Sequence, residues 1–304
     1  VAMLSTSQEE GVDIDYFFAQ VAVDKAEVDF SVTCGNILVG VGPAALEMGL
    51  APITGAVTKL TIRAVNTGAL IDVIVQTPDG HVTYEGDTEI SGVFGTSAPV
   101  NVSFLGVVGT NCGAMLPTGN LRDTIDGIEI TCMDVAMPMM IARADAFGLT
   151  GYETAEELDA DQALFAKMEA IRLQAGILMG LGDVTRSVIP KIGLLAKPRD
   201  GGSFCVRYFM PWKTHPTMAV TGSQCVAACA LTPGTVADGL TSLPQGTPAL
   251  ISVEHPQGVI DVTVDYTRTD NATQIKSAGL IRSARLIARG EVMVSSGLMG
   301  RKIP

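Results

Sequence analysis

Two segments rich in glycine, alanine and other small residues limit what this 304-residue chain can fold into. Residues 36–48 and 215–231 each have the length of a helix, and their small side chains allow a helix to lie deep among strands. Alternating or β-branched apolar runs, which are typical of strands, occur on both sides of each segment. The pattern predicts an α+β fold with two pseudo-duplicated, β-rich halves that each contain one such helix.

Strands are expected to make up most of the remaining structure. The turn T-P-D-G at 77–80 leads into 81–85, so 69–85 is predicted to be a hairpin. L-P-T-G-N at 116–120 marks a domain border, which gives an N-terminal domain of 1–115 plus 286–304 and a C-terminal domain of 116–285. The expected strands are 1–4, 16–23, 60–64, 69–76, 128–134, 139–144, 191–196, 204–209, 249–254 and 259–266, and 277–294 closes the pattern.

Three helices are expected. The first, 36–48, takes its cap from Thr33 or a neighbour and ends at Gly49, while Gly42-Pro43 inside it predicts a kink or close packing. The second, 155–178, has acidic residues early and basic residues late, in agreement with the helix dipole. The third begins at His215 and ends before a Pro-Gly pair.

Composition excludes several classes of function. The net charge is −12 and there is no cluster of Lys or Arg, so we expect neither nucleic acid nor a membrane as a partner. No segment is long and apolar enough to span a bilayer. The six cysteines are scattered without a C-x-x-C pair, which argues against a metal site and favours a reducing, cytoplasmic location.

Cys34 is the leading candidate for a catalytic group. A thiol at the start of a helix lies near the positive end of the helix dipole, which favours the thiolate. Gly35 lets a ligand approach the backbone, and the N–H groups of Gly35 and Asn36 could bind a carboxylate or a developing enolate. A buried, small apolar residue at a tight turn is the alternative for Cys34.

Other residues carry weaker signals, each with a structural alternative. His215 could cap its helix or bind a ligand, and it is the best partner for Cys34 in a Cys–His hydrolase. Arg282 and Arg285, three apart, could clamp a carboxylate or could lie on a solvated helix face. Ligand contacts or ordinary turns are the two interpretations of Asn66, Thr118, Gly119 and Asn120.

Several segments together resemble the PrpF-type isomerases, a family that includes 2-methylaconitate isomerase, methylitaconate isomerase and 4-oxalomesaconate tautomerase. The resemblance runs in order through nearly the whole chain. It is carried by T-C-G-N-I-L-V-G-V-G-P-A-A-L-E-M-G-L (33–50), A-V-N-T-G (64–68), C-G-A-M-L-P-T-G-N (112–120), I-P-K-I (189–192) and G-L-I-R-S-A-R-L (279–286).

The resemblance implies a diaminopimelate-epimerase-like fold of two pseudo-symmetric domains, whose central helices point their N-termini at each other across a cleft. It implies isomerisation or tautomerisation of a small unsaturated di- or tricarboxylate by proton transfer, without metal or organic cofactor. Cys34 would be one acid/base, and the family's second, a lysine, would immediately precede Val1. We therefore expect a segment upstream of Val1, and a homodimer is a candidate oligomeric state.

The resemblance leaves the exact substrate open. Val12–Tyr16 and related segments look like the 4-oxalomesaconate branch, whereas the segment 215–222 is nearer to aconitate-type members, and 134–138 departs from the D-N-G-M-P of the former. An amino-acid racemase or epimerase of the same fold is an alternative, although it usually needs a second cysteine facing Cys34. A non-catalytic carboxylate-binding protein is the alternative outside enzymes.

Overall fold

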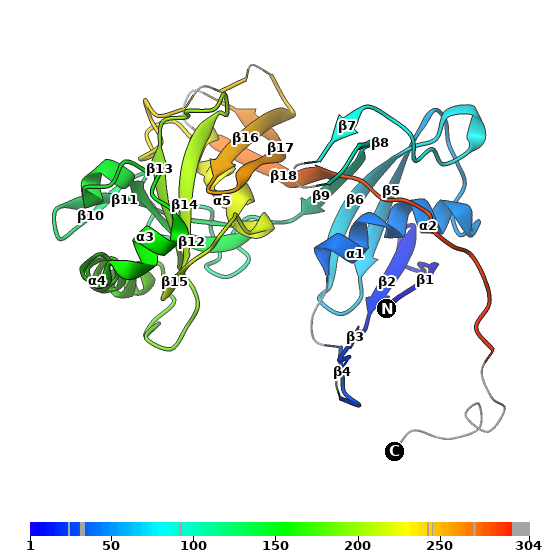
Figure 1. Ribbon diagram of the computed structural model, residues 1–304, viewed down its shortest axis with the longest axis horizontal. Coiled ribbons are helices and arrows are strands. Elements are labelled where there is room, and N and C mark those ends of the chain that lie inside the picture. Colours follow the sequence, from blue (N-terminus) through cyan, green and yellow to red (C-terminus); the bar gives the residue numbers. More distant parts are fainter. Residues whose placement is uncertain are drawn as a thin grey trace.

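The computed structural model describes residues 1–23, 25–30, 34–90, 93–241, 243–244, 246–269 and 272–293. Two β-rich halves lie side by side, and each contains helices packed on its strands (Figure 1). The main elements of the N-terminal half are β1 (Ala2–Thr6), β2 (Ile14–Phe18), α1 (Gly35–Val39), α2 (Val41–Glu47), β5 (Val57–Ala64), β6 (Ala69–Gln76) and β9 (Val100–Leu105).

The C-terminal half contains more strands and the longer helices. Its strands are β10 (Asp123–Ile125), β11 (Ile128–Val135), β12 (Met137–Arg143), β13 (Lys191–Ala196), β14 (Phe204–Met210), β15 (Lys213–Thr214), β16 (Ala249–His255), β17 (Gly258–Arg268) and β18 (Thr273–Arg282). Its helices are α3 (Ala155–Ala160), α4 (Gln162–Leu178) and α5 (Val220–Leu231). Smaller elements of the chain are β3 (Gln20–Val21), β4 (Val28–Asp29), β7 (Thr88–Glu89), β8 (Thr96–Ser97), η1 (Pro78–Gly80) and η2 (Ala144–Phe147).

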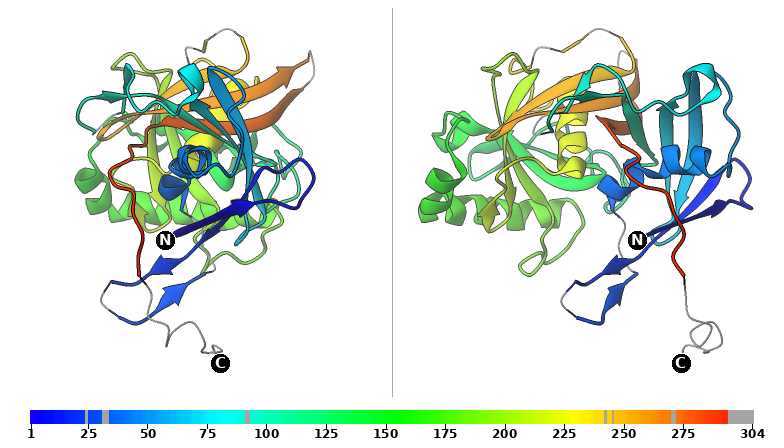
Figure 2. Two further views of the ribbon diagram at one scale, coloured as in Figure 1. Left: turned by 90° about the vertical axis from the view of Figure 1, so that its right-hand side faces the viewer. Right: turned by 45° about the vertical axis from the view of Figure 1, so that its right-hand side comes forward.

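One continuous sheet connects the two halves. Its strand order is β1-β2-β5-β6-β9-β18-β17-β16-β14-β13-β12-β11-β10, so β9 and β18 form the seam, with Val102 opposite Leu280. Beyond β18 the chain returns across the N-terminal half, where Arg289 pairs with Glu47 of α2 at 2.5 Å (Figure 2). The predicted α+β fold class is confirmed. The domain boundaries stay a prediction, and residues 294–304 lie outside the described part.

The first predicted helix is two short helices. Gly40 separates α1 from α2. Of the predicted caps, Thr33 or a neighbour, the neighbour Cys34 occupies the N-cap position of α1 without a side-chain cap bond, and Thr33 lies outside the described residues. Close packing at Gly42 is confirmed, because a Cβ there would come within 2.7 Å of Cγ1 of Val73 in β6.

The predicted start of the third helix at His215 was wrong. The helix α5 begins at Val220, after β15 and a loop. His215 precedes a proline, and the proline ring disfavours a helical conformation of the residue before it. From Gly222 to its end α5 is buried, in contact with β11, β12, β17 and β18, as small residues allow.

Three further predictions need correction. The strand β6 pairs with β5 and β9, and 81–85 forms no strand, so the hairpin 69–85 was wrong. The helix 155–178 is divided at Asp161, whose carboxylate caps α4 by accepting from the Leu164 amide at 2.9 Å. The final strand was predicted over 277–294, but β18 ends at Arg282. Residues 283–293 form no regular structure. None of the described helices is long and apolar enough to cross a membrane.

Candidate active site

A cavity of about 450 Å³ opens where the two halves meet. The N-terminal half contributes Thr67 and Gly68, from the turn between β5 and β6, and Phe104 near the end of β9. The C-terminal half contributes Thr221 and Gln224 from the beginning of α5. The Phe104 ring packs against the apolar cores of both halves, so it fixes this wall relative to both. We call this cavity the interdomain groove.

The α5 end of the groove presents unsatisfied polar groups. Among the described residues no side chain caps α5, whose N-cap is Ala219, so the N–H groups of its first turn are available to an anion. Gln224 is fully buried; its Nε2 donates to the Ala278 carbonyl at 3.1 Å, and its Oε1 has no hydrogen-bond partner in the described chain. The sequence interpretation missed Thr221 and Gln224. The sequence feature that could have identified them is the presence of polar residues inside an otherwise apolar helix of small residues.

Cys34 lies at the beginning of α1, in the N-terminal half. Its backbone is extended (φ −119°, ψ 110°), its carbonyl accepts from the Tyr16 hydroxyl at 3.4 Å, and its side chain is half-buried against the local core. Gly35 and Asn36 follow as exposed residues of the first helical turn. The helix α1 packs on β9, the strand that carries Phe104 to the groove. Because α1 has five residues, its dipole is weaker than the predicted thirteen-residue helix implied.

Asn66 holds together the segment that leads to Cys34. Its Oδ1 accepts from the Phe18 amide at 2.7 Å, and its Nδ2 donates to the carbonyls of Phe18 at 2.9 Å and Phe30 at 2.6 Å. These bonds occupy the amide, while the next residues, Thr67 and Gly68, line the groove. Asn66 therefore positions the groove wall, and its predicted ligand contact stays a prediction.

The turn Thr118-Gly119-Asn120 is closed by a carboxylate from its own half. Asp123 accepts from the Thr118 hydroxyl and from Nδ2 of Asn120, both at 2.7 Å. Gly119 has φ +76°, which a glycine adopts without strain. The ordinary-turn interpretation fits these contacts, and a substrate role for the three residues stays a prediction.

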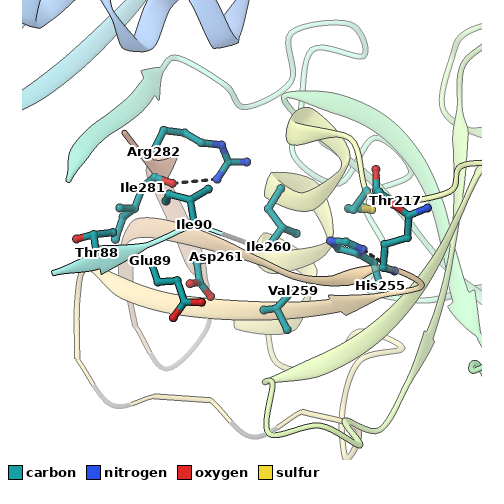
Figure 3. A pocket seen from close by; sticks show the side chains of 12 residues that line it. Thr88, Glu89, Ile90, Thr217, His255, Val259, Ile260, Asp261, Ile281 and Arg282 are labelled. Carbon is teal, nitrogen blue, oxygen red and sulfur yellow. Dashed lines mark hydrogen bonds between the residues drawn. The ribbon is translucent and has the colours of Figure 1, made fainter. Parts of the chain in front are cut away.

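The two arginines of R-S-A-R lie in different surroundings, and the predicted carboxylate clamp stays a prediction. Arg282 ends β18 and lines a second cavity of about 350 Å³ with Thr217, His255 and Asp261 (Figure 3). Burial lowers the pKa of Arg282. Arg285 lies in the extended tail, is exposed, and donates to Glu85 at 3.3 Å. Neither arginine is on a helix, so the solvated-helix alternative was wrong.

His215 contacts neighbours in its own half. Its ring lies edge-on to Tyr208 at 5.7 Å between centroids, and its Nδ1 accepts from the Thr217 amide at 3.1 Å. Burial lowers the pKa of His215, which favours the neutral ring that this acceptor requires. These contacts orient Thr217 beside the Arg282 cavity, and they give no support to a Cys34–His215 hydrolase pair.

Comparisons with known proteins agree on one family. The model of the PrpF protein family matches residues 1–295. The chain is 46% identical to the 4-oxalomesaconate tautomerase of Pseudomonas putida over 99% of this chain and 82% of that protein. It is 45% identical to the (4E)-oxalomesaconate Delta-isomerase of Novosphingobium sp., over 97% of this chain and 82% of that protein.

A solved structure extends the likeness to the fold. The crystal structure of a methylitaconate-delta-isomerase superposes with a TM-score of 0.85 at 30% identity, over 96% of this chain and 80% of that one. The chain therefore matches the family along nearly its whole length. It also has the family's sequence motifs, and its two β-rich halves meet at the interdomain groove. The protein belongs to the PrpF family.

Proposed function

We propose that the protein is a cofactor-independent isomerase that moves a carbon–carbon double bond in a small unsaturated tricarboxylate of the 4-oxalomesaconate class. The observation that carries the proposal is the difference in sequence identity between this chain and its relatives. The two proteins named for oxalomesaconate share 45–46% of their residues with this chain. The 3-methylitaconate isomerase of Eubacterium barkeri and the 2-methyl-aconitate isomerase of Shewanella oneidensis share 31% and 30%.

The proposed chemistry is proton transfer at the two ends of an allylic system. Removal of a proton conjugated with a keto or carboxylate group produces a dienolate, and return of a proton at the other end moves the double bond. Oriented N–H donors stabilise such a developing negative charge, especially where water is excluded. The uncapped first turn of α5 supplies donors of this kind beside the groove.

Cys34 is the acid/base group that we assign to one end of the allylic system. Thiolate and thiol can serve as base and conjugate acid. Its support is its place in T-C-G-N, its partial exposure and the packing of α1 on β9. The other acid/base implied by the family resemblance is a lysine immediately before Val1.

The two alternatives have less support. A racemase of this fold needs a second thiol facing the first, but Cys225 and Cys229 are fully buried within α5, and Cys225 directs its thiol at the Met133 carbonyl at 3.6 Å. A non-catalytic binding protein would be unusual among relatives that are named isomerases or tautomerases.

A proton-exchange experiment tests the proposal. The protein is incubated in deuterated buffer with 4-oxalomesaconate, methylaconitate, methylitaconate and aconitate in turn, and proton NMR follows exchange and isomerisation against enzyme-free controls. We expect exchange and turnover to be fastest with 4-oxalomesaconate. Faster turnover of another acid would contradict the substrate assignment alone, and an absence of exchange with all four would contradict the isomerase assignment.

A further inference from the structure

Arg207 is a buried cation on the face of the sheet opposite α5. In β14, Phe204, Val206 and Tyr208 pack into the core that contains α5, whereas Cys205 and Phe209 belong to the core on the α4 side. Because side chains alternate along a strand, Arg207 projects to the α4 side, away from the core around α5. The residue is 4% exposed.

Among the described residues, the Arg207 guanidinium has no acidic partner. Its Nε donates to the Glu153 carbonyl at 2.7 Å, and its Nη1 donates to the Val206 carbonyl at 3.1 Å and Sγ of Cys205 at 3.3 Å. Within the described residues, Nη2 donates no hydrogen bond and no carboxylate oxygen lies within 4.0 Å of the guanidinium nitrogens. A buried charge without an opposite charge is energetically costly.

Arg172, the other arginine that is buried among the described residues, has an opposite charge beside it. Arg172 is fully buried, and its Nε and Nη2 donate to the two carboxylate oxygens of Glu169 at 2.6 and 2.7 Å. Arg172 thus has the bidentate partner that Arg207 lacks. The difference indicates that an anion from outside the chain could complete the Arg207 environment.

Two adjoining cavities give such an anion access. One of about 250 Å³ and one of about 170 Å³ share Tyr152, Arg207 and Pro256 in their walls. The Tyr152 ring lies 5.8 Å from Cζ of Arg207, and the exposed Arg199 lies over the same ring at 5.2 Å. His255 lines the larger cavity, and its pKa is lowered by burial and then by the charge of Arg207.

Four carboxylates line the two cavities, and among the described residues none of them pairs with Arg207. In the smaller cavity, Glu153 accepts from the amides of Thr150 and Gly151, and Glu156 is exposed. Glu254 is buried in the wall of the larger cavity, but its oxygens accept from the amides of Arg199, Asp200 and Gly202 at 2.9, 2.8 and 2.7 Å. Asp200 contributes an exposed side chain to the same wall. Glu254 is therefore engaged in holding the 199–202 loop, and Arg207 retains its open Nη2.

We propose that Arg207 anchors a binding site for a small oxyanion, a carboxylate or a phosphate, in the cavities beside Tyr152. The anion accepts from Nη2 of Arg207 and supplies the missing negative charge. It joins the segment at Tyr152–Glu153, the strand β14 and the turn at Pro256, so binding stabilises the folded C-terminal half. This site lies on the other side of the sheet from the α5 core and shares no lining residue with the interdomain groove.

Anion-dependent thermal unfolding tests the site. The melting temperature is measured against inorganic phosphate and, separately, malonate, with sodium chloride at matched ionic strength as the reference. We expect a saturable rise with at least one of the two anions, and the comparison between them identifies the preferred chemistry. In Arg207→Gln the apparent Kd for that anion should weaken at least tenfold, whereas Arg199→Gln, at the exposed arginine over the same ring, should respond like the parent.

A second measurement keeps the proposal testable if Arg207→Gln fails to fold. Crystals of the unaltered protein are soaked in selenate, an oxyanion located by its anomalous scattering, and a peak within hydrogen-bond distance of Arg207 Nη2 is expected. The proposal is overturned if neither anion raises the melting temperature beyond the chloride reference. It is equally overturned if a folded Arg207→Gln keeps the parent response, or if selenate leaves the Arg207 cavities empty.

Discussion

The cysteines differ in what their surroundings allow them to do. Four are buried, and burial raises the pKa of Cys132 and of Cys229 to about 12. Cys112 is partly exposed, but burial and the charge of Asp134 raise its pKa to about 11. These thiols stay protonated at neutral pH, so they are poor bases. Cys34, half-buried where α1 begins, is the thiol to which we assign the proposed proton transfer.

Two partly buried histidines are expected to make stability depend on pH. Burial lowers the pKa of His215 and His255 below the usual value of about 6.5, so the unfolded chain takes up protons first as the pH falls. Their contribution is complete above about pH 6.5 and is lost as the pH falls through the folded-state values. Urea unfolding between pH 7 and 5 should therefore show a declining free energy of unfolding.

Histidine variants separate the contribution of these two histidines from that of titrating carboxylates. His215→Asn combined with His255→Asn should flatten the decline, whereas His81→Asn, at an exposed position, should leave it unchanged. A double variant with the parent slope would show that other groups cause the pH dependence.

At the scale of the elements, the junction of α1 and α2 explains the glycines of G-V-G-P. The chain breaks at Gly40, and Pro43 then lies in the first turn of α2, where its missing N–H removes no helical bond. Gly42 allows α2 to approach β6 closely, since a Cβ there would lie 2.7 Å from Val73 and 3.0 Å from Val75 side-chain carbons.

Alanine substitutions at the two glycines should have opposite effects. Gly42→Ala overpacks the contact with β6 and is expected to destabilise the protein by about 1–3 kcal/mol. Gly40→Ala meets no atom closer than the Ile37 carbonyl oxygen at 3.5 Å and has an αR backbone, so it should be neutral or stabilising by up to about 1 kcal/mol. Chemical denaturation measures both, and equal destabilisation would contradict the packing argument.

Local sequence patterns predicted individual elements better than their pairing. The strands β6 and β13 match the predicted 69–76 and 191–196 because apolar side chains and turn residues define them locally. The partner of β6 could not be predicted, since β9 lies more than twenty residues further along the chain. The same limit applies to the site: Cys34 became a candidate through its motif and stays a prediction, whereas Gln224 lines the groove only through the packing of α5.

At the scale of the whole molecule, the β9–β18 seam makes the two halves parts of one sheet. Gly279 of β18 lies at this seam opposite Ser103, and a Cβ there would overlap the Val102 carbonyl oxygen. We expect the halves to unfold together in the unaltered protein, because separating them exposes both strand edges and the Phe104 contacts.

Gly279→Ala should weaken that coupling. Calorimetry is expected to show a single transition for the parent and a lower, broader or divided transition for the variant, with Ser277→Ala in the same strand as the control. A Gly279→Ala protein that melts like the parent would show that the seam does not couple the halves.

Deuterium exchange by Cys34→Ser, compared with Cys112→Ser, addresses the proposed mechanism most directly. With 4-oxalomesaconate in deuterated buffer, Cys34→Ser should lose at least about a hundredfold in exchange and isomerisation, the lower range for removal of a general acid–base group, while its melting temperature stays near that of the parent. Cys112→Ser should retain most of the activity. Near-parent turnover by a folded Cys34→Ser protein would contradict proton transfer by this thiol.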